Sequence, residues 1–368
     1  MSRTEAPSYR ASLAEYELRA EALLEDLHAG DGAAAQRFKW EHPRYRDQPL
    51  RAVDPAELGL DDARLVVAHE HAFEDWQDLA RFTDAVQAGG PVERFERAVE
   101  SVVAGDLATL RRMLHEQPEL VRARSTRRHH ATLLHYLGAN GVEGARQCTP
   151  PNAVDLAKLL LNAGAEVDAL ADMYDERCTT LSMLVSSSPP AQAGLQGALA
   201  ELLLDHGAAL DGPGSKWQSA ILTALLFGFL DTAQVLARRG VRVDDLVTAA
   251  GLGRRKDAAR LLPDAGGESR HAALALAAQL GHLDVVALLL DAGEDPSRYN
   301  PEGHHAHATP LHQAVWAGHQ SVVRLLVERG ARLDIRDTIF DATPLDWASY
   351  GQRTEIAELL RQLGAPEH

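Results

Sequence analysis

The feature that most constrains how this chain can fold is a segment near its C-terminal end that is written twice in succession. The first copy, TPLHQAVWAGHQSVVRLLVERGARLDIRD, covers residues 309–337, and the second begins at Thr343, 34 residues after Thr309 (343 minus 309). Threonine followed by proline is typical of a helix start, because threonine caps free amides and proline costs no hydrogen bond in the first turn. A glycine such as Gly330 ends a helix in the left-handed conformation. Each copy therefore predicts a helix, a turn and a second helix.

Apolar residues lie on both predicted helices of each copy, as the run VVRLLV at 322–327 illustrates. One pair of short helices cannot bury its own apolar face, so we expect the pairs to stack against one another. A chain of 368 residues is longer than one hydrophobic core ordinarily accommodates. A solenoid has no such limit on length, because each unit contacts only its neighbours. An aromatic content of only 5% favours close-packed helices over strands.

The motif TPLH at 309–312, its glycines and its spacing resemble the ankyrin repeat, which recurs about every 33 residues. The resemblance extends over residues 92–366 and is most specific near the C-terminal end. It implies an all-α ankyrin-repeat solenoid, with short β-hairpin loops between the units and an N-terminal helical cap. It also implies that His312 and His135 hydrogen-bond to neighbouring backbone, whereas Asp346 replaces this histidine in the last unit.

Residues 92–368 read as about eight such units, of which the first, fourth and fifth are degenerate because they lack the TPLH start. The second and third units carry insertions of about eleven and about seven residues between their helices, and such insertions map to one face of a solenoid. We therefore expect residues 141–155 and 188–198 to form a raised lip along one edge.

Residues 1–90 form a separate helical region. Apolar periodicity predicts helices over 13–29 and 33–40 and a further helix that starts at Asp61 or Asp62. The stretch LVVAHEHAFEDW at 65–76 resembles the helical segment that precedes the repeats in many bacterial ankyrin proteins. We expect this region to cover the apolar end of the stack, as the terminal units of solenoids must.

Charge and composition disfavour several functional classes. A formal net charge of −16 repels phosphate backbones, so nucleic acid is not the expected partner. The two cysteines, Cys148 and Cys178, have neither zinc-finger spacing nor the density of a disulfide scaffold. The sequence contains no apolar run of about 18 residues and no apolar N-terminal stretch, so we expect no membrane span, no signal peptide and a cytoplasmic location.

A basic cluster occupies the predicted hairpin tip of the second unit, at Arg127, Arg128, His129 and His130. On a protein this acidic, such a tip is suited to recognise a carboxylate, a phosphate or an acidic partner. The alternative is a solvated loop that balances the acidic helices.

Three histidines, His304, His305 and His307, lie in the hairpin before the seventh unit. Alternate residues of an extended arm point to one side, so His305 and His307 are candidates to share a metal. Zinc requires three or four ligands, and only Glu302 lies close in sequence to complete the set. A solvated polar loop is the alternative, and we predict no cofactor.

Because ankyrin repeats are protein-interaction modules, the resemblance implies that a concave groove and the hairpin tips bind a protein partner. The residues predicted to contact it are Arg127, Arg128, His129, His130, Tyr136, Asn140, Tyr174, His305, His307, Trp316, Trp347 and Tyr350. The alternative is a small-molecule or metal-dependent enzyme that uses a polar pocket near the inserted second and third units and the histidine-rich hairpin. No nucleophile elbow, His-Glu-x-x-His or P-loop motif occurs, so an enzyme is not expected. Two further possibilities are that the repeats assemble with a second copy of the chain and that the groove binds a small ligand.

Overall fold

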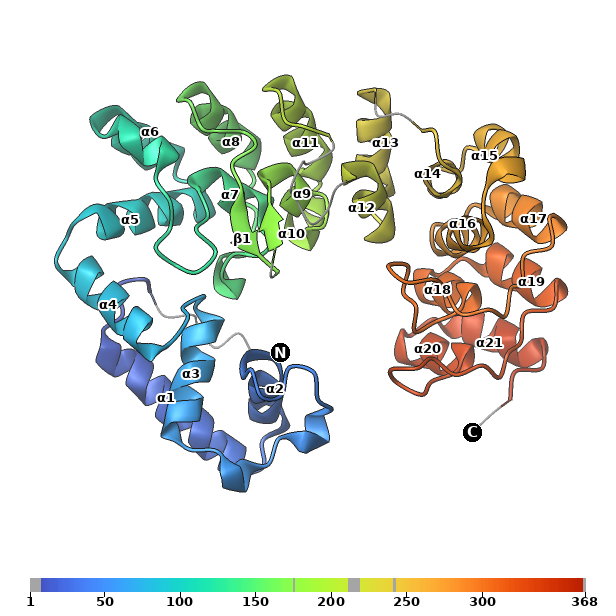
Figure 1. The fold of residues 1–368 in the computed structure, drawn as a ribbon, viewed down its shortest axis with the longest axis horizontal. Helices are drawn as coiled ribbons and strands as arrows, with labels where there is room; N and C mark the ends of the chain where they lie inside the picture. The colour runs from blue at the N-terminus through green and yellow to red at the C-terminus, as the bar shows by residue number, and fades with distance from the viewer. Residues whose placement is uncertain (1–7, 175, 211–218, 241–242, 367–368) are drawn as a thin grey trace. The chain divides into compact units, whose positions relative to one another are not determined.

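A computed structural model describes residues 8–174, 176–210, 219–240 and 243–366. The outermost residues of the two predicted regions, 1–7 and 367–368, therefore lie outside the described residues. The chain forms two compact units, residues 1–218 and residues 219–368. Both are built almost entirely of helices, as predicted, and from α5 onward the helices of each unit are paired (Figure 1).

The first four helices form a small bundle with its own apolar core. They are α1 (Leu13–His28), α2 (Gly32–Glu41), α3 (Leu60–Glu70) and α4 (Trp76–Gln87), with 3-10 turns η1 (Leu50–Ala52) and η2 (Pro55–Glu57). Ser12 starts α1 through a capping box with Glu15, and Asp31 accepts two backbone amides at the start of α2. The first two helices coincide with those that the sequence predicts.

Three helix pairs complete the first unit. They are α5 (Pro91–Val103) with α6 (Leu107–Glu116), α7 (Leu133–Gly138) with α8 (Ala153–Asn162), and α9 (Thr180–Leu184) with α11 (Gln196–Asp205). Shorter elements connect them: η3 (Pro118–Arg122), η4 (Gly144–Arg146), α10 (Ser188–Gln192), and an antiparallel pair of strands, β1 (Ala171–Met173) and β2 (Glu176–Cys178). In this hairpin Ala171 lies opposite Cys178.

The described residues of the second unit form five helix pairs. The first helices of the pairs, here called the first row, are α12 (Ala220–Leu226), α14 (Leu246–Gly251), α16 (Gly267–Gln279), α18 (Pro310–Ala317) and α20 (Pro344–Tyr350). Their partners, the second row, are α13 (Leu230–Arg238), α15 (Arg255–Leu261), α17 (Leu283–Asp291), α19 (Gln320–Glu328) and α21 (Thr354–Gln362), with η5 (Leu262–Asp264) after α15. One apolar core runs through the last four pairs, so each pair buries the apolar face of the next.

Two histidines each tie a helix pair to the hairpin that follows it. His135 Nε2 lies 3.3 Å from the carbonyl oxygen of Cys178, and His312 Nε2 lies 3.2 Å from that of Ala342. The other ring nitrogen of each faces the threonine hydroxyl at the start of its own helix. These contacts confirm the backbone-binding role that the resemblance implies. Asp346, in the last pair, instead accepts hydrogen bonds from the threonine that starts α20.

In the second unit, histidines in the turns of two helix pairs also form hydrogen bonds with the preceding pair. The Nε2 atom of His282 lies 2.8 Å from the Gly251 carbonyl oxygen, and that of His319 lies 3.0 Å from the Gln279 carbonyl oxygen. Gly281 has a φ of +79°, and a Cβ there would lie 2.6 Å from Nδ1 of His319. The turn therefore requires glycine both for its left-handed backbone and for the space that the histidine ring fills.

The insertion in the second helix pair does not form the predicted raised lip. It folds through η4 and buries Val142, Glu143 and Arg146. Arg146 forms ion pairs with Glu96 and Glu100 of α5, at 2.7 and 2.6 Å. These charge partners on α5 hold the insertion against the preceding pair, because a buried guanidinium requires carboxylates around it.

Candidate partner-binding surface

The most exposed large aromatic side chains of the second unit lie on first-row helices and at one hairpin tip. Trp316 of α18 is 47% exposed and Tyr350 of α20 is 85% exposed. Phe340, in the loop between α19 and α20, is 71% exposed. A group of exposed large apolar side chains is typical of a surface that contacts another molecule.

These side chains belong to a continuous run of ring contacts, here called the aromatic face: Tyr350, Trp316, Trp347, His307 and Phe340. The ring centroids of Trp316 and Tyr350 are 6.4 Å apart with nearly parallel planes, and those of Trp316 and Trp347 are 6.0 Å apart. His307 lies 5.9 Å from Trp347 and 6.4 Å from Phe340. The face therefore joins four of the residues predicted to contact a partner, and it adds Phe340.

Asp337 fixes the hairpin tip that carries Phe340. Its buried carboxylate accepts the backbone amides of Ile339, Phe340 and Ala342 at 2.9, 2.7 and 3.2 Å. It also accepts the indole N–H of Trp347 at 2.9 Å. Burial by itself raises the pKa of Asp337, but these donors outweigh it and hold the pKa below its ordinary value. The tip is thus ordered by an ionised carboxylate rather than by apolar contacts.

A pocket of about 510 Å³ adjoins the aromatic face, and Trp316 lines both. Its other walls come from the end of α12 and the turn after it, the end of α16, α18, and His305. Apolar lining residues include Leu226, Phe227 and Leu280, and no Asp, Glu, Lys or Arg side chain is part of the lining. The pocket is therefore apolar and aromatic with a few neutral polar groups, which is the usual character of a binding pocket.

Two polar groups of this pocket have no partner within the described part of the chain. The side-chain amide of Gln313 lines the pocket, although the residue is only 5% exposed, and it forms no hydrogen bond there. The indole N–H of Trp316 likewise donates to no described residue, in contrast to that of Trp347. Both residues line the pocket, so these two groups are available to a ligand there.

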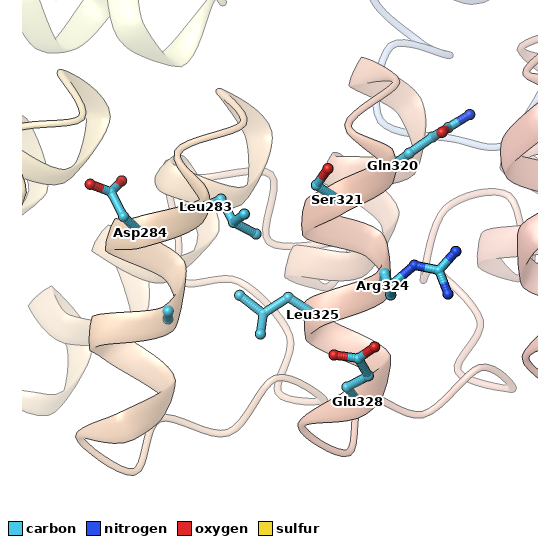
Figure 2. Close-up of a pocket in the computed structure, with 8 residues that line it drawn as sticks. Leu283, Asp284, Gln320, Ser321, Arg324, Leu325 and Glu328 are labelled. Carbon is cyan, nitrogen blue, oxygen red and sulfur yellow. The ribbon is translucent and has the colours of Figure 1, made fainter.

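A larger depression, of about 660 Å³, lies between the second-row helices α17 and α19. Figure 2 shows Leu283 of α17 and Leu325 of α19 above its floor, with Asp284, Arg324 and Glu328 around them. It is the ordinary groove between two packed helices, since its polar side chains are exposed and point into solvent. We therefore place the candidate site on the first row, where exposed aromatic rings and unpaired polar groups occur together.

The structure corrects the prediction of an exposed hairpin tip for Arg127 and His129, and it also buries the predicted contact residue Tyr136. Arg127, His129 and Tyr136 are 3%, 2% and 1% exposed, respectively. Arg127 Nε lies 2.5 Å from Glu143 Oε1, and His129 Nε2 lies 3.4 Å from Glu143 Oε2. Sequence reasoning missed the carboxylate that draws these side chains inward, because Glu143 lies in the insertion of the same helix pair. These three residues do not reach a partner in this structure.

Arg127 and Arg146 form a buried ion cluster with Glu96 and Glu143. Arg146 Nη1 lies 2.7 Å from Glu96 Oε2 and 3.0 Å from Glu143 Oε1, and Arg127 Nη2 lies 3.4 Å from Glu96 Oε2. Burial by itself raises the pKa of Glu143, but the two guanidinium groups and His129 outweigh it and hold this pKa well below its ordinary value. Each charge thus depends on the others for its place in the interior.

Arg127 also connects the N-terminal helical bundle to the helix pairs of the first unit. Its guanidinium carbon lies 4.7 and 4.4 Å from the ring centroids of Phe73 and Phe82. Arg127 Nη1 also donates to the His71 carbonyl oxygen at 2.6 Å, and the backbone amide of Arg128 donates to Ala72. The hairpin that carries the basic cluster is therefore an internal connection within the first unit.

The remaining contact residues predicted for the first unit lie closer to solvent. His130 is exposed, and its Nδ1 lies 2.9 Å from Asp172 Oδ2. Tyr174 is exposed and donates to the side chain of Asn140, which is half-buried, as is Arg128. Their contact with a partner stays a prediction.

The histidines of the hairpin before α18 lie at different places. His305 lines the pocket, and His307 belongs to the aromatic face, with 6.1 Å between their ring centroids. Burial lowers the pKa of His304, whose two ring nitrogens have no hydrogen-bond partner among the residues described. Nowhere in the described ranges do three or more His, Cys, Asp or Glu side chains lie close enough together to hold a metal ion.

Sequence reasoning missed several residues of this surface. Phe227 contributes a wall of the pocket, Asp337 supports the hairpin tip, and Phe340 contributes an exposed ring. One signal was present, because the apolar pair Ile339-Phe340 interrupts an otherwise polar loop between two units. Gln313 is one of the positions that the ankyrin resemblance places facing the groove, but its burial and its lack of a hydrogen-bond partner depend on how α18 packs.

Comparisons with known proteins identify ankyrin repeats in the second unit. A family model described as ankyrin repeats (3 copies) matches residues 246–337 and 302–366. The chain is similar to the ankyrin repeat-containing protein P1E11.10 of Schizosaccharomyces pombe, with 42% identity over 62 residues, which cover 17% of this chain and 28% of that protein. It is also similar to the ankyrin repeat and SAM domain-containing protein 6 of Mus musculus, with 34% identity over 103 residues, which cover 28% of this chain and 11% of that protein. The matches thus span less than a third of either relative.

Among solved structures, the chain is similar to the crystal structure of the human ASB11 ankyrin repeat domain. The sequence identity is 20% and the TM-score 0.39, and the alignment covers 74% of this chain and 99% of that chain. None of the described helices is long and apolar enough to cross a membrane. The described residues of both units form an all-α fold of paired helices, and the family match identifies ankyrin repeats over residues 246–366.

Proposed function

We propose that the protein binds a protein partner through the aromatic face and the adjoining pocket of its second unit. The observation that carries this proposal is the unbroken run of ring contacts from Tyr350 through Trp316 to Phe340, with all three of these side chains exposed. Exposed tryptophan and tyrosine side chains supply much of the free energy of binding at protein interfaces. Ankyrin repeats are generally protein-interaction modules, which supports the same reading.

Neither the motifs nor the related proteins support the enzyme alternative. The cytoplasmic location and the bacterial type of the N-terminal segment stay predictions.

Site-specific photo-crosslinking tests the proposal. A photoreactive phenylalanine analogue is placed at Tyr350 or at Phe340 in the full chain, which is then irradiated in an extract of the source cells. We expect both positions to crosslink to the same protein, and we expect Trp316→Ala to abolish the product, because it removes the ring between them.

The matched control carries the analogue at Arg324, an exposed residue of α19 in the second row (Figure 2). Equal crosslinking from Arg324, or a product that persists unchanged in the Trp316→Ala variant, would show that this surface does not select the partner.

A further inference from the structure

We propose that the pocket beside Trp316 recognises a proline-rich segment of the partner in the polyproline II conformation. This inference rests on the proposed function and names the chemistry of the segment that is bound. Three properties of the pocket select such a segment: its lack of charge, its unpaired hydrogen-bonding groups and its exposed rings.

The first property is charge. The pocket lining contains no acidic residue, lysine or arginine, although the chain as a whole carries 53 acidic and 37 basic residues. A charged side chain that enters such a pocket loses its hydration without gaining an opposite charge, which is unfavourable. The complementary occupant is therefore an uncharged segment.

The second property is the pair of unpaired polar groups. The indole N–H of Trp316 can only donate, and the amide of Gln313 can donate or accept, so an occupant that pairs with both must present at least one acceptor. A polyproline II segment has no internal hydrogen bonds, which leaves its carbonyl oxygens free to accept. An α-helix uses its carbonyl oxygens internally and offers few of them to a partner.

The third property is the arrangement of the rings. Trp316 and Tyr350 stack with 19° between their ring planes and 6.4 Å between their centroids, and both side chains are exposed beside the pocket. Phe227, 46% exposed, lines the pocket from the turn after α12. Proline-rich segments dock into aromatic-lined grooves of this kind, and their stiffness lowers the entropy lost on binding.

Calorimetric titration of the full chain with a capped decaproline peptide tests the inference. A capped Gly-Ser peptide of equal length is the control for charge and flexibility, and a capped amphipathic helical peptide represents the competing occupant. We expect saturable binding of decaproline only. We further expect about tenfold weaker binding for Gln313→Leu, the effect of one lost hydrogen bond, and a larger loss for Trp316→Ala. Arg324→Ala is expected to bind like the unmodified chain.

The Gln313→Leu variant also separates a binding role from a structural one. Because Gln313→Leu removes an amide that lines the pocket and has no partner in the described part of the chain, we expect its thermal stability to be unchanged or raised while decaproline binding falls. A fall in stability instead would assign Gln313 to the fold and contradict the inference.

Three further results would overturn the inference: no binding of decaproline, equal binding of the Gly-Ser peptide, or preferential binding of the helical peptide. Crosslinking from Tyr350 and Phe340 then decides whether the proposed protein-binding function still holds. If those crosslinks persist, the proposed function stands without its proline-rich ligand, and if they are absent, both fail.

Discussion

His312 of α18 holds the hairpin that leads into α20, because its Nε2 lies 3.2 Å from the carbonyl oxygen of Ala342. The same ring faces the hydroxyl of Thr309 through Nδ1, at 2.8 Å. A single buried side chain therefore starts its own helix and positions the next pair, which is how neighbouring units come to fold together.

Replacing this ring is expected to weaken the second unit. His312→Ala removes the hydrogen-bond partner of the Thr309 hydroxyl and one of two donors to the Ala342 carbonyl oxygen, the other being the Asp337 backbone amide, and it opens a cavity. We therefore expect a loss of about 2–4 kcal/mol in the free energy of unfolding. Urea denaturation followed by circular dichroism measures it. The control is His304→Ala, which removes a ring without hydrogen bonds. If the control is destabilised as much as His312→Ala, the hydrogen bonds are not what matters.

Stability is expected to fall as the pH drops from about 6.5 towards about 4. Burial lowers the pKa of His135 and of His312 to about 4, from 6.5 in the unfolded chain. Between these values the unfolded state binds more protons than the native state, so acidification favours unfolding. From pH 7.5 to pH 5, each histidine is expected to cost about 2 kcal/mol of stability.

The test compares urea denaturation at these two pH values for the unmodified chain and for His312→Gln. We expect the pH-dependent loss to shrink by about 2 kcal/mol in the variant. The ion cluster does not interfere strongly in this range, because Glu143 stays ionised well below its ordinary pKa of 4.5. An unchanged pH dependence in the variant would mean that His312 does not titrate on unfolding.

Breaking the buried ion cluster is expected to destabilise the first unit. Arg127→Met removes the partner of Glu143 and Glu96 and leaves buried carboxylates underpaired, so we expect a loss of about 3–5 kcal/mol. The matched control is Arg128→Ala, a half-buried neighbour, for which we expect a change of about 0.5 kcal/mol or less. Thermal denaturation measures both variants. A small effect for Arg127→Met would show that the cluster contributes little to stability.

Substituting two glycines distinguishes the cost of backbone strain from the cost of a steric clash. Gly293 has a φ of +93° with open space around its Cβ position, so Gly293→Ala is expected to cost about 1 kcal/mol, the strain of a left-handed alanine. Gly281→Ala adds a contact of 2.6 Å with the His319 ring, and we expect it to cost clearly more, about 2–3 kcal/mol. Urea denaturation decides, and equal losses would refute the role of the ring.

Asp337→Ala is expected to loosen the exposed hairpin tip while leaving most of the unit folded. The backbone amides of Ile339, Phe340 and Ala342 lose their acceptor, so hydrogen exchange at these positions should accelerate. Crosslinking of the partner from Phe340 should weaken in parallel. Asp341→Asn is the control, because Asp341 lies in the same loop and is exposed. If exchange accelerates equally in both variants, Asp337 does not order the tip.

The sequence predicted the helix pairs and the structural histidines because both depend on local chemistry. Capping threonines, first-turn prolines and left-handed glycines act within a few residues of their position, so the TPLH motif suffices to start α18 and α20. The aromatic residues Trp316, Trp347 and Tyr350 were predicted as contact residues for a similar reason, since their place in the repeat sets which row of helices they lie on.

Only the tertiary structure decided which polar residues are buried. Arg127 and His129 have the composition of a solvated loop, yet Glu96 and Glu143 surround them with negative charge that arrives from distant positions in the chain. The pocket likewise depends on α12, α16 and α18 meeting around the unpaired amide of Gln313. Local sequence determines where helices begin and end, whereas burial and charge pairing depend on contacts between residues far apart in the chain, which no single segment encodes.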